Sequence, residues 1–69
     1  MAFIQLTDQY GNKIAVNVAH ICVIRPVRNG AAITMVNNEE VIVKETYAEI
    51  GKKIIWLFSF AIYNKINLI

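Results

Sequence analysis

The sequence predicts a small α+β domain in which an antiparallel sheet of about five strands precedes one C-terminal helix. Short apolar segments separated by Gly, Asn, Asp and Pro fill the chain as far as Lys44. A helix-capping sequence at Thr46–Glu49 and apolar residues at helical spacing follow. We expect the 69 residues to form a single domain, 1–69. We expect the strands to form a strongly curved meander, with a barrel-like closure as an open alternative.

The first two strands are predicted from alternation of apolar and polar residues. Residues 3–7 and 13–18 both alternate in this way. Between them lies the sequence Asp-Gln-Tyr-Gly-Asn, which is typical of a turn. We therefore expect a β-hairpin at the start of the chain.

The next three strands are predicted at residues 20–25, 31–36 and 41–44. The first is almost continuously apolar, and Pro26 either ends it or places it at a sheet edge. Asn29-Gly30 follows and predicts a type I′ turn, because both residues tolerate a positive φ.

The helix is expected to begin after Thr46, whose hydroxyl can accept from the Glu49 N–H while the Glu49 carboxylate accepts from the Thr46 N–H. Either Asn64 or Asn67 is expected to end it. At 100° per residue one stripe faces the sheet. That stripe consists of Ile50, Ile54, Leu57, Phe58 and Ala61.

Residues 54–63 are apolar around almost the whole helix, and the polar side carried by Lys52 and Lys53 stops there. A small sheet can cover only one side of such a helix, so we expect other copies of the chain to cover the rest. The predicted oligomer interface consists of Trp56, Phe60, Ile62 and Tyr63. Function would then reside in a surface that assembly creates, with a protein as the expected partner.

Composition supports association between chains. A domain of this size is marginally stable alone, and the usual remedies are disulfides, a metal or oligomerisation. One Cys and one His exclude an intrachain disulfide and cannot complete a metal site within one chain. The apolar content of 57% therefore favours a homo-oligomer, and we expect no cofactor or metal.

No catalytic constellation is predicted. On a single strand His20 and Cys22 would face the same side, as a thiol and imidazole pair requires. A Cys within an apolar strand is more simply a small buried hydrophobe, and no third residue orients the pair. We expect a non-enzymatic protein with no catalytic residues.

Two alternative surfaces remain open. Assembly could multiply Lys13, Arg25 and Arg28 into a basic ring that binds nucleic acid, although the net charge is only +2. The apolar run at 54–63 corresponds to about 15 Å of helix, too short for a hydrocarbon core of about 30 Å, but it could attach to a membrane surface. A single free thiol and the absence of a signal peptide favour the cytoplasm.

The segment 30–50 resembles the FlbD-like family of small bacterial flagellar and swarming-motility proteins. Its strand ending Val43-Lys44-Glu45 and the helix opening at Thr46–Ile50 match that pattern, as do residues 3–7 and 13–17. The resemblance covers about residues 3–54 and implies a non-enzymatic adaptor or regulatory protein of bacteria; similar short chains also occur in phages. Residues 55–69 replace the short, charged helix end expected of the family, which strengthens the case for an oligomer.

Overall fold

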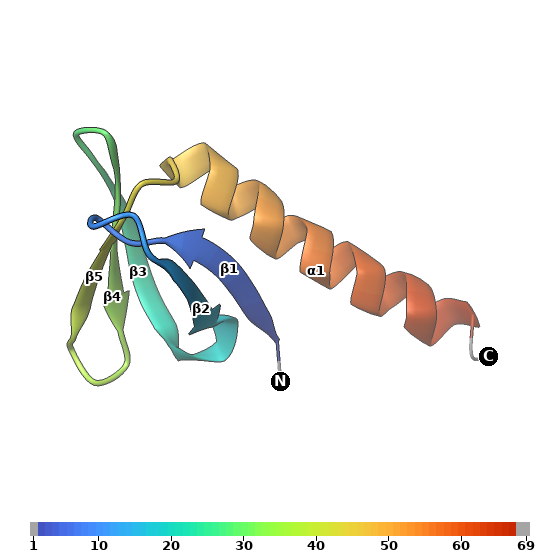
Figure 1. Cartoon of the computed structure of the whole chain (residues 1–69). Coiled ribbons are helices and arrows are strands. Elements are labelled where there is room, and N and C mark those ends of the chain that lie inside the picture. Colours follow the sequence, from blue (N-terminus) through green and yellow to red (C-terminus); the bar gives the residue numbers. More distant parts are fainter. Residues whose placement is uncertain (1, 68–69) are drawn as a thin grey trace.

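The computed structural model describes residues 2–67, with side chains described for residues 2–59. Five antiparallel strands precede one long helix, as predicted (Figure 1). The elements in order are β1 (Phe3–Thr7), β2 (Lys13–Asn17), a 3-10 helix η1 (Val18–His20), β3 (Ile21–Val27), β4 (Gly30–Met35), β5 (Glu40–Val43) and α1 (Tyr47–Asn67).

The strands form two sheets and do not close into a barrel. One sheet is the β1–β2 hairpin, and the other has the order β3-β4-β5. The sequence did not predict η1, which links β2 to β3. At the other join the Lys44 N–H donates to the carbonyl of Thr7 at 2.8 Å, and Asp8 bridges Val43. The two sheets are therefore connected at η1 and at the Thr7–Lys44 contact. Between these connections the sheets diverge on two sides, one beside β1 and β3 and the other between β2 and β5.

The core lies between the two sheets and under the first half of α1. Leu6, Ile33 and Ile50 are completely buried there. Each such side chain contributes roughly 1.5–3 kcal/mol to the stability of the fold, because its apolar surface is removed from water. The remaining buried members of this cluster are Ile4, Val16, Ala31 and Val43. Ile54 and Leu57 pack against its edge, so α1 helps to close the domain.

Strand β3 lies at an edge and is irregular. Pro26 pairs with Ala31 inside the strand, which is tolerated because an edge strand has one side without ladder hydrogen bonds. The second alternative for Pro26 is therefore confirmed. Ile21 pairs with Met35 but Val23 pairs with Thr34, so Cys22 is the extra residue of a β-bulge.

The β3–β4 turn differs from the predicted type I′ turn. Its central residues are Arg28 and Asn29, and of the two only Asn29 has a positive φ, 65°. Gly30 is already the first residue of β4, and its φ is not positive. A Cβ there would lie 2.0 Å from the carbonyl oxygen of Val43, so the close approach of β5 explains this glycine.

Helix α1 begins as predicted. The Glu49 N–H donates to Thr46 Oγ1 at 3.1 Å, and the Thr46 N–H donates to Glu49 Oε1 at 2.9 Å. The helix is described as far as Asn67, so it continues past Asn64, the first of the two predicted stops. Figure 1 shows α1 running beside β1 and then continuing past the sheets. The last ten residues, 58–67, correspond to about 15 Å of helix.

Candidate interaction surface

The middle of α1 carries large exposed apolar side chains on the sides that do not face the core. Ile55 is 65% exposed, Trp56 is 70% exposed and Phe58 is 59% exposed. The prediction that Phe58 packs on the sheet was therefore wrong, whereas Ile50, Ile54 and Leu57 do contact the core. Phe58 lies about 80° around the helix from Ile50, and this narrow sheet does not extend that far. The side chain of Ala61 lies outside the described residues.

One flank of the helix forms an apolar stripe, which we define as Tyr47, Gly51, Ile55 and Phe58. These positions fall within about 80° of the helix circumference at 100° per residue. The three large members are exposed. Sequence reasoning missed this stripe, although the angular spacing alone could have identified it.

The stripe borders a groove between β3 and α1, which we call the β3–α1 groove. Its volume is about 450 Å³. The residues that line it are Ile21, Cys22, Ile24, Tyr47, Gly51 and Ile55. A Cβ added at Gly51 would meet nothing within 4 Å, so this part of the groove is open to an approaching side chain or helix.

The predicted interface lies only partly within the described side chains. Trp56 is exposed in the single chain, and it lies on the opposite flank from the stripe, at the same side as Glu49 and Lys53. The side chains of Phe60, Ile62 and Tyr63 lie outside the described residues. The exposed apolar surface of α1 therefore has two flanks, the stripe and the side that carries Trp56. Only the stripe borders the β3–α1 groove.

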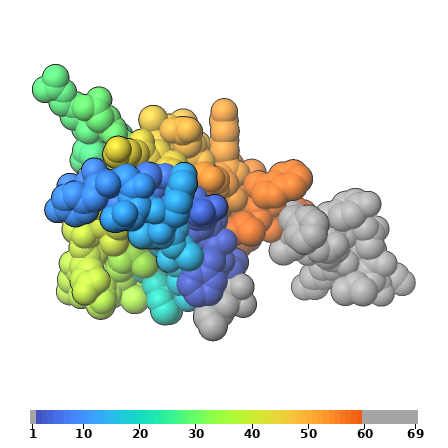
Figure 2. Space-filling view, viewed as in Figure 1, coloured from blue at the N-terminus to red at the C-terminus, as the bar shows by residue number. Residues whose placement is uncertain are grey.

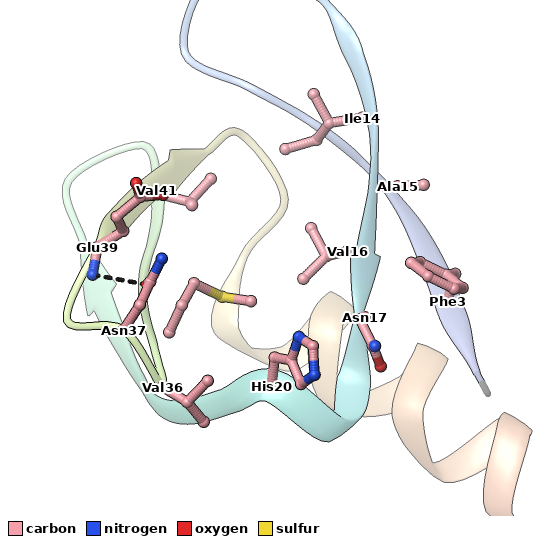
Figure 3. Close-up of a pocket in the computed structure, with 11 residues that line it drawn as sticks. Phe3, Ile14, Ala15, Val16, Asn17, His20, Val36, Asn37, Glu39 and Val41 are labelled. Carbon is pink, nitrogen blue, oxygen red and sulfur yellow. Dashed lines mark hydrogen bonds between the residues drawn. The ribbon is translucent and has the colours of Figure 1, made fainter.

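A second groove lies at the opening between β2 and β5, and we call it the β2–β5 groove. Its volume is about 530 Å³. Figure 3 shows Ile14 and Val16 of β2 directed across this space towards Val41 of β5. The other lining residues are Phe3, Ala15, Asn17, His20, Met35, Val36, Asn37 and Glu39. No pattern in the sequence predicts this groove, because it depends on how the two sheets diverge.

His20 and Cys22 do not form a pair on one strand. His20 belongs to η1 and lines the β2–β5 groove, whereas Cys22 occupies the bulge in β3 and lines the β3–α1 groove. The expectation that Cys22 is buried was also wrong, because its side chain is exposed. Within the described part of the chain, no group of three or more His, Cys, Asp or Glu side chains could hold a metal ion.

The three basic residues proposed for nucleic acid come from separate elements. Lys13 Nζ in β2 donates to Thr7 Oγ1 at 3.2 Å, and Arg25 in β3 forms an ion pair with Glu40 in β5. Arg28 belongs to the β3–β4 turn, which protrudes from the body of the domain in the space-filling view (Figure 2). A basic ring across copies therefore stays a prediction, and one of its members already has an acidic partner.

The carboxylates with shifted pKa values have structural roles. The backbone N–H of Asn12 is the main cause of the lowered pKa of Asp8, which organises the β1–β2 turn. The Thr46 N–H holds the pKa of Glu49 below its usual value in the helix cap. Burial acts to raise the pKa of Glu45, but hydrogen bonds from Thr7 outweigh it and the pKa is lowered. The hydrogen bonds that lower these pKa values stabilise the charged carboxylates at a turn, at a helix cap and at the contact between Glu45 and Thr7.

Comparison with known proteins gives one match. The model of a family described as FlbD, flagellar and swarming motility proteins, matches residues 3–59. No curated protein and no solved structure matches the chain. No helix within the described residues is long and apolar enough to cross a membrane. The family match covers β1 to β5 and the described side chains of α1, and so the chain belongs to the FlbD family of flagellar and swarming motility proteins.

Proposed function

We propose that this protein is a non-enzymatic, homo-oligomeric interaction protein of the bacterial motility apparatus, acting as an adaptor or regulator. Family membership supports the motility setting. The observation that carries the proposal is the exposed apolar surface of α1, formed by Ile55, Trp56 and Phe58. We place the protein in the cytoplasm, where a free, exposed thiol such as that of Cys22 stays reduced.

The grouping of exposed apolar side chains along the stripe supports assembly. Large apolar side chains that lie together on a surface mark interaction sites in soluble proteins. Burying one such side chain fully contributes roughly 1.5–3 kcal/mol, so Ile55 and Phe58 of the stripe can offset part of the entropy lost when two chains associate. Tyr47 and Gly51 extend the same surface along the stripe, and aromatic residues are enriched in interface cores.

Sedimentation equilibrium of the full chain tests this proposal. We expect the wild type to sediment at a multiple of 7.8 kDa at micromolar concentration. The double variant Ile55→Lys/Phe58→Lys should raise the dissociation constant about 100-fold or more, because assembly would no longer bury two large apolar side chains. Both positions are exposed, so the fold should tolerate the change.

The control is Ser59→Lys, which places one lysine at an exposed position of the same helix outside the stripe. This variant should assemble like the wild type. Far-ultraviolet circular dichroism of all three proteins would establish that the helix is retained. A wild-type chain that stays at 7.8 kDa across the micromolar range would refute the proposal.

A further inference from the structure

The two openings between the sheets are occupied differently. At the opening beside β1 and β3, α1 inserts Ile50, Ile54 and Leu57 against the core. At the opening between β2 and β5 no element of the described chain is inserted, and the β2–β5 groove lies there (Figure 3). The same apolar interior that receives a helix on one side is therefore open on the other.

The β2–β5 groove has the size and lining of a site for apolar side chains. Its volume of about 530 Å³ falls in the range of roughly 300–1,000 Å³ that is typical of ligand sites. Ile14, Met35 and Val41 are only partly buried, although they pack against the core. Val36 at the rim is exposed. Filling the groove would remove these side chains from water.

The charges of the groove and of α1 are complementary. Glu39 is the one acidic side chain among the groove's lining residues, and no ion pair involves it within residues 2–59. Lys52 is exposed on α1 and lies about 60° from Ile55 around the helix, next to the stripe. A helix that placed Ile55 in the groove would carry a lysine able to approach Glu39.

We infer that the β2–β5 groove receives the apolar stripe of a second copy, with Ile55 and Phe58 inserted and Lys52 near Glu39. The inference rests on the proposed function, because it names the surface that the exposed helix contacts. Groove and stripe are different surfaces of one chain, so the contact is heterologous. Copies would associate head to tail, and each groove would be completed by its neighbour's helix.

Mixing two variants that each lack one surface tests the inference. The helix variant is Ile55→Lys/Phe58→Lys, and the groove variant is Val36→Lys/Glu39→Lys; all four positions are exposed. Each variant alone should sediment as a monomer. An equimolar mixture should form a 1:1 heterodimer, because the helix of the groove variant still fits the groove of the helix variant. Gln5→Lys/Gln9→Lys, at exposed positions outside both grooves, should assemble like the wild type.

A charge exchange adds a second measurement. Glu39→Lys and Lys52→Glu should each weaken self-association about tenfold, and a mixture of the two variants should recover part of that loss in the heterodimer. Normal assembly of the groove variant, with only the helix variant monomeric, would mean that helices pair directly and would overturn the inference while leaving the proposed function intact. Failure of the mixture to form a heterodimer would overturn it as well.

Discussion

Glu45 accepts hydrogen bonds from Thr7 through both of its carboxylate oxygens and so holds the segment before the helix against the first strand. The Thr7 N–H donates to Glu45 Oε1 at 2.8 Å, and the Thr7 hydroxyl donates to Oε2 at 2.9 Å. Together with the hydrogen bond from the Lys44 N–H to the Thr7 carbonyl, this contact joins the two sheets beside the start of α1. The direction of the helix therefore depends on the N-terminal hairpin.

Removing this carboxylate should destabilise the fold. Glu45→Ala leaves the Thr7 N–H without its partner in a partly buried place, and we expect a loss of about 1–3 kcal/mol in the free energy of unfolding by urea. Thr7→Val removes one of the two donors, and a double-mutant cycle should give a coupling of about 1 kcal/mol. Glu40→Ala, which removes only an exposed ion pair with Arg25, is the control and should cost less than about 1 kcal/mol. Equal losses for the two glutamates would contradict this role.

Stability should fall in acid. The pKa of Glu45 is lower in the folded chain than in the unfolded one. Its contribution to the free energy of unfolding is therefore present above about pH 4.3 and is lost as the pH falls through the folded-state pKa. Asp8 and Glu49 have lowered pKa values and act in the same direction. Urea unfolding between pH 7 and pH 3 should show this decline. In Glu45→Gln the decline should be smaller, and an unchanged pH profile in that variant would count against the assignment.

Gly30→Ala should be strongly destabilising. The added methyl group would lie 2.0 Å from the Val43 carbonyl oxygen, which belongs to the backbone of β5 and cannot rotate away. We expect a loss of about 2–4 kcal/mol in thermal or urea unfolding. Gly51→Ala is the contrasting substitution, because an added Cβ there meets nothing within 4 Å and alanine favours a helix by roughly 1 kcal/mol. A mild effect of Gly30→Ala would show that β4 and β5 are not so closely apposed.

Loss of the helix cap should also reduce stability. Thr46→Ala removes the acceptor of the Glu49 N–H, and we expect a cost of about 0.5–2 kcal/mol in the free energy of unfolding. Ser59→Ala, in the exposed middle of the same helix, should be neutral or slightly stabilising. If both substitutions had the same effect on the free energy of unfolding, the cap would not contribute to stability in solution.

Nucleic-acid binding, the alternative function, can be measured directly. Fluorescence anisotropy with mixed single-stranded RNA and duplex DNA at low salt should show no saturable binding, because Arg25 is paired with Glu40 and the other two basic residues lie on separate elements. Binding that disappears in Arg25→Ala/Arg28→Ala would favour the alternative. Binding that persists in this variant would not arise from those arginines.

The features predicted correctly depend on residues close together in the chain. The cap between Thr46 and Glu49 spans one helical turn, and the alternation of β1 and β2 spans five residues each. Pro26 left two alternatives, and choosing between them required knowing that β3 has a neighbour on one side only. The sequence-based resemblance to the FlbD family was confirmed, and the matched region extends further than expected, to residue 59.

The features that were missed depend on distant contacts. The Asn29-Gly30 sequence suggested a turn, but the constraint on Gly30 comes from Val43, thirteen residues later. The bulge at Cys22 follows from pairing with β4 and separates this residue from His20. Phe58 was assigned to the sheet because helical periodicity gives an angle but not the width of the surface that receives it. For the same reason neither groove could be derived from periodicity.

The bulge in β3 gives the chain a natural attachment point for a reporter. Cys22 is the one cysteine of the sequence, and its thiol is exposed beside Gly51 and Ile55. A maleimide dye would therefore label every molecule at a single defined site without any engineered substitution. This site borders the stripe, so a neighbouring copy that covers the stripe should slow the reaction of the thiol, and the labelling rate would then report whether the helix is covered.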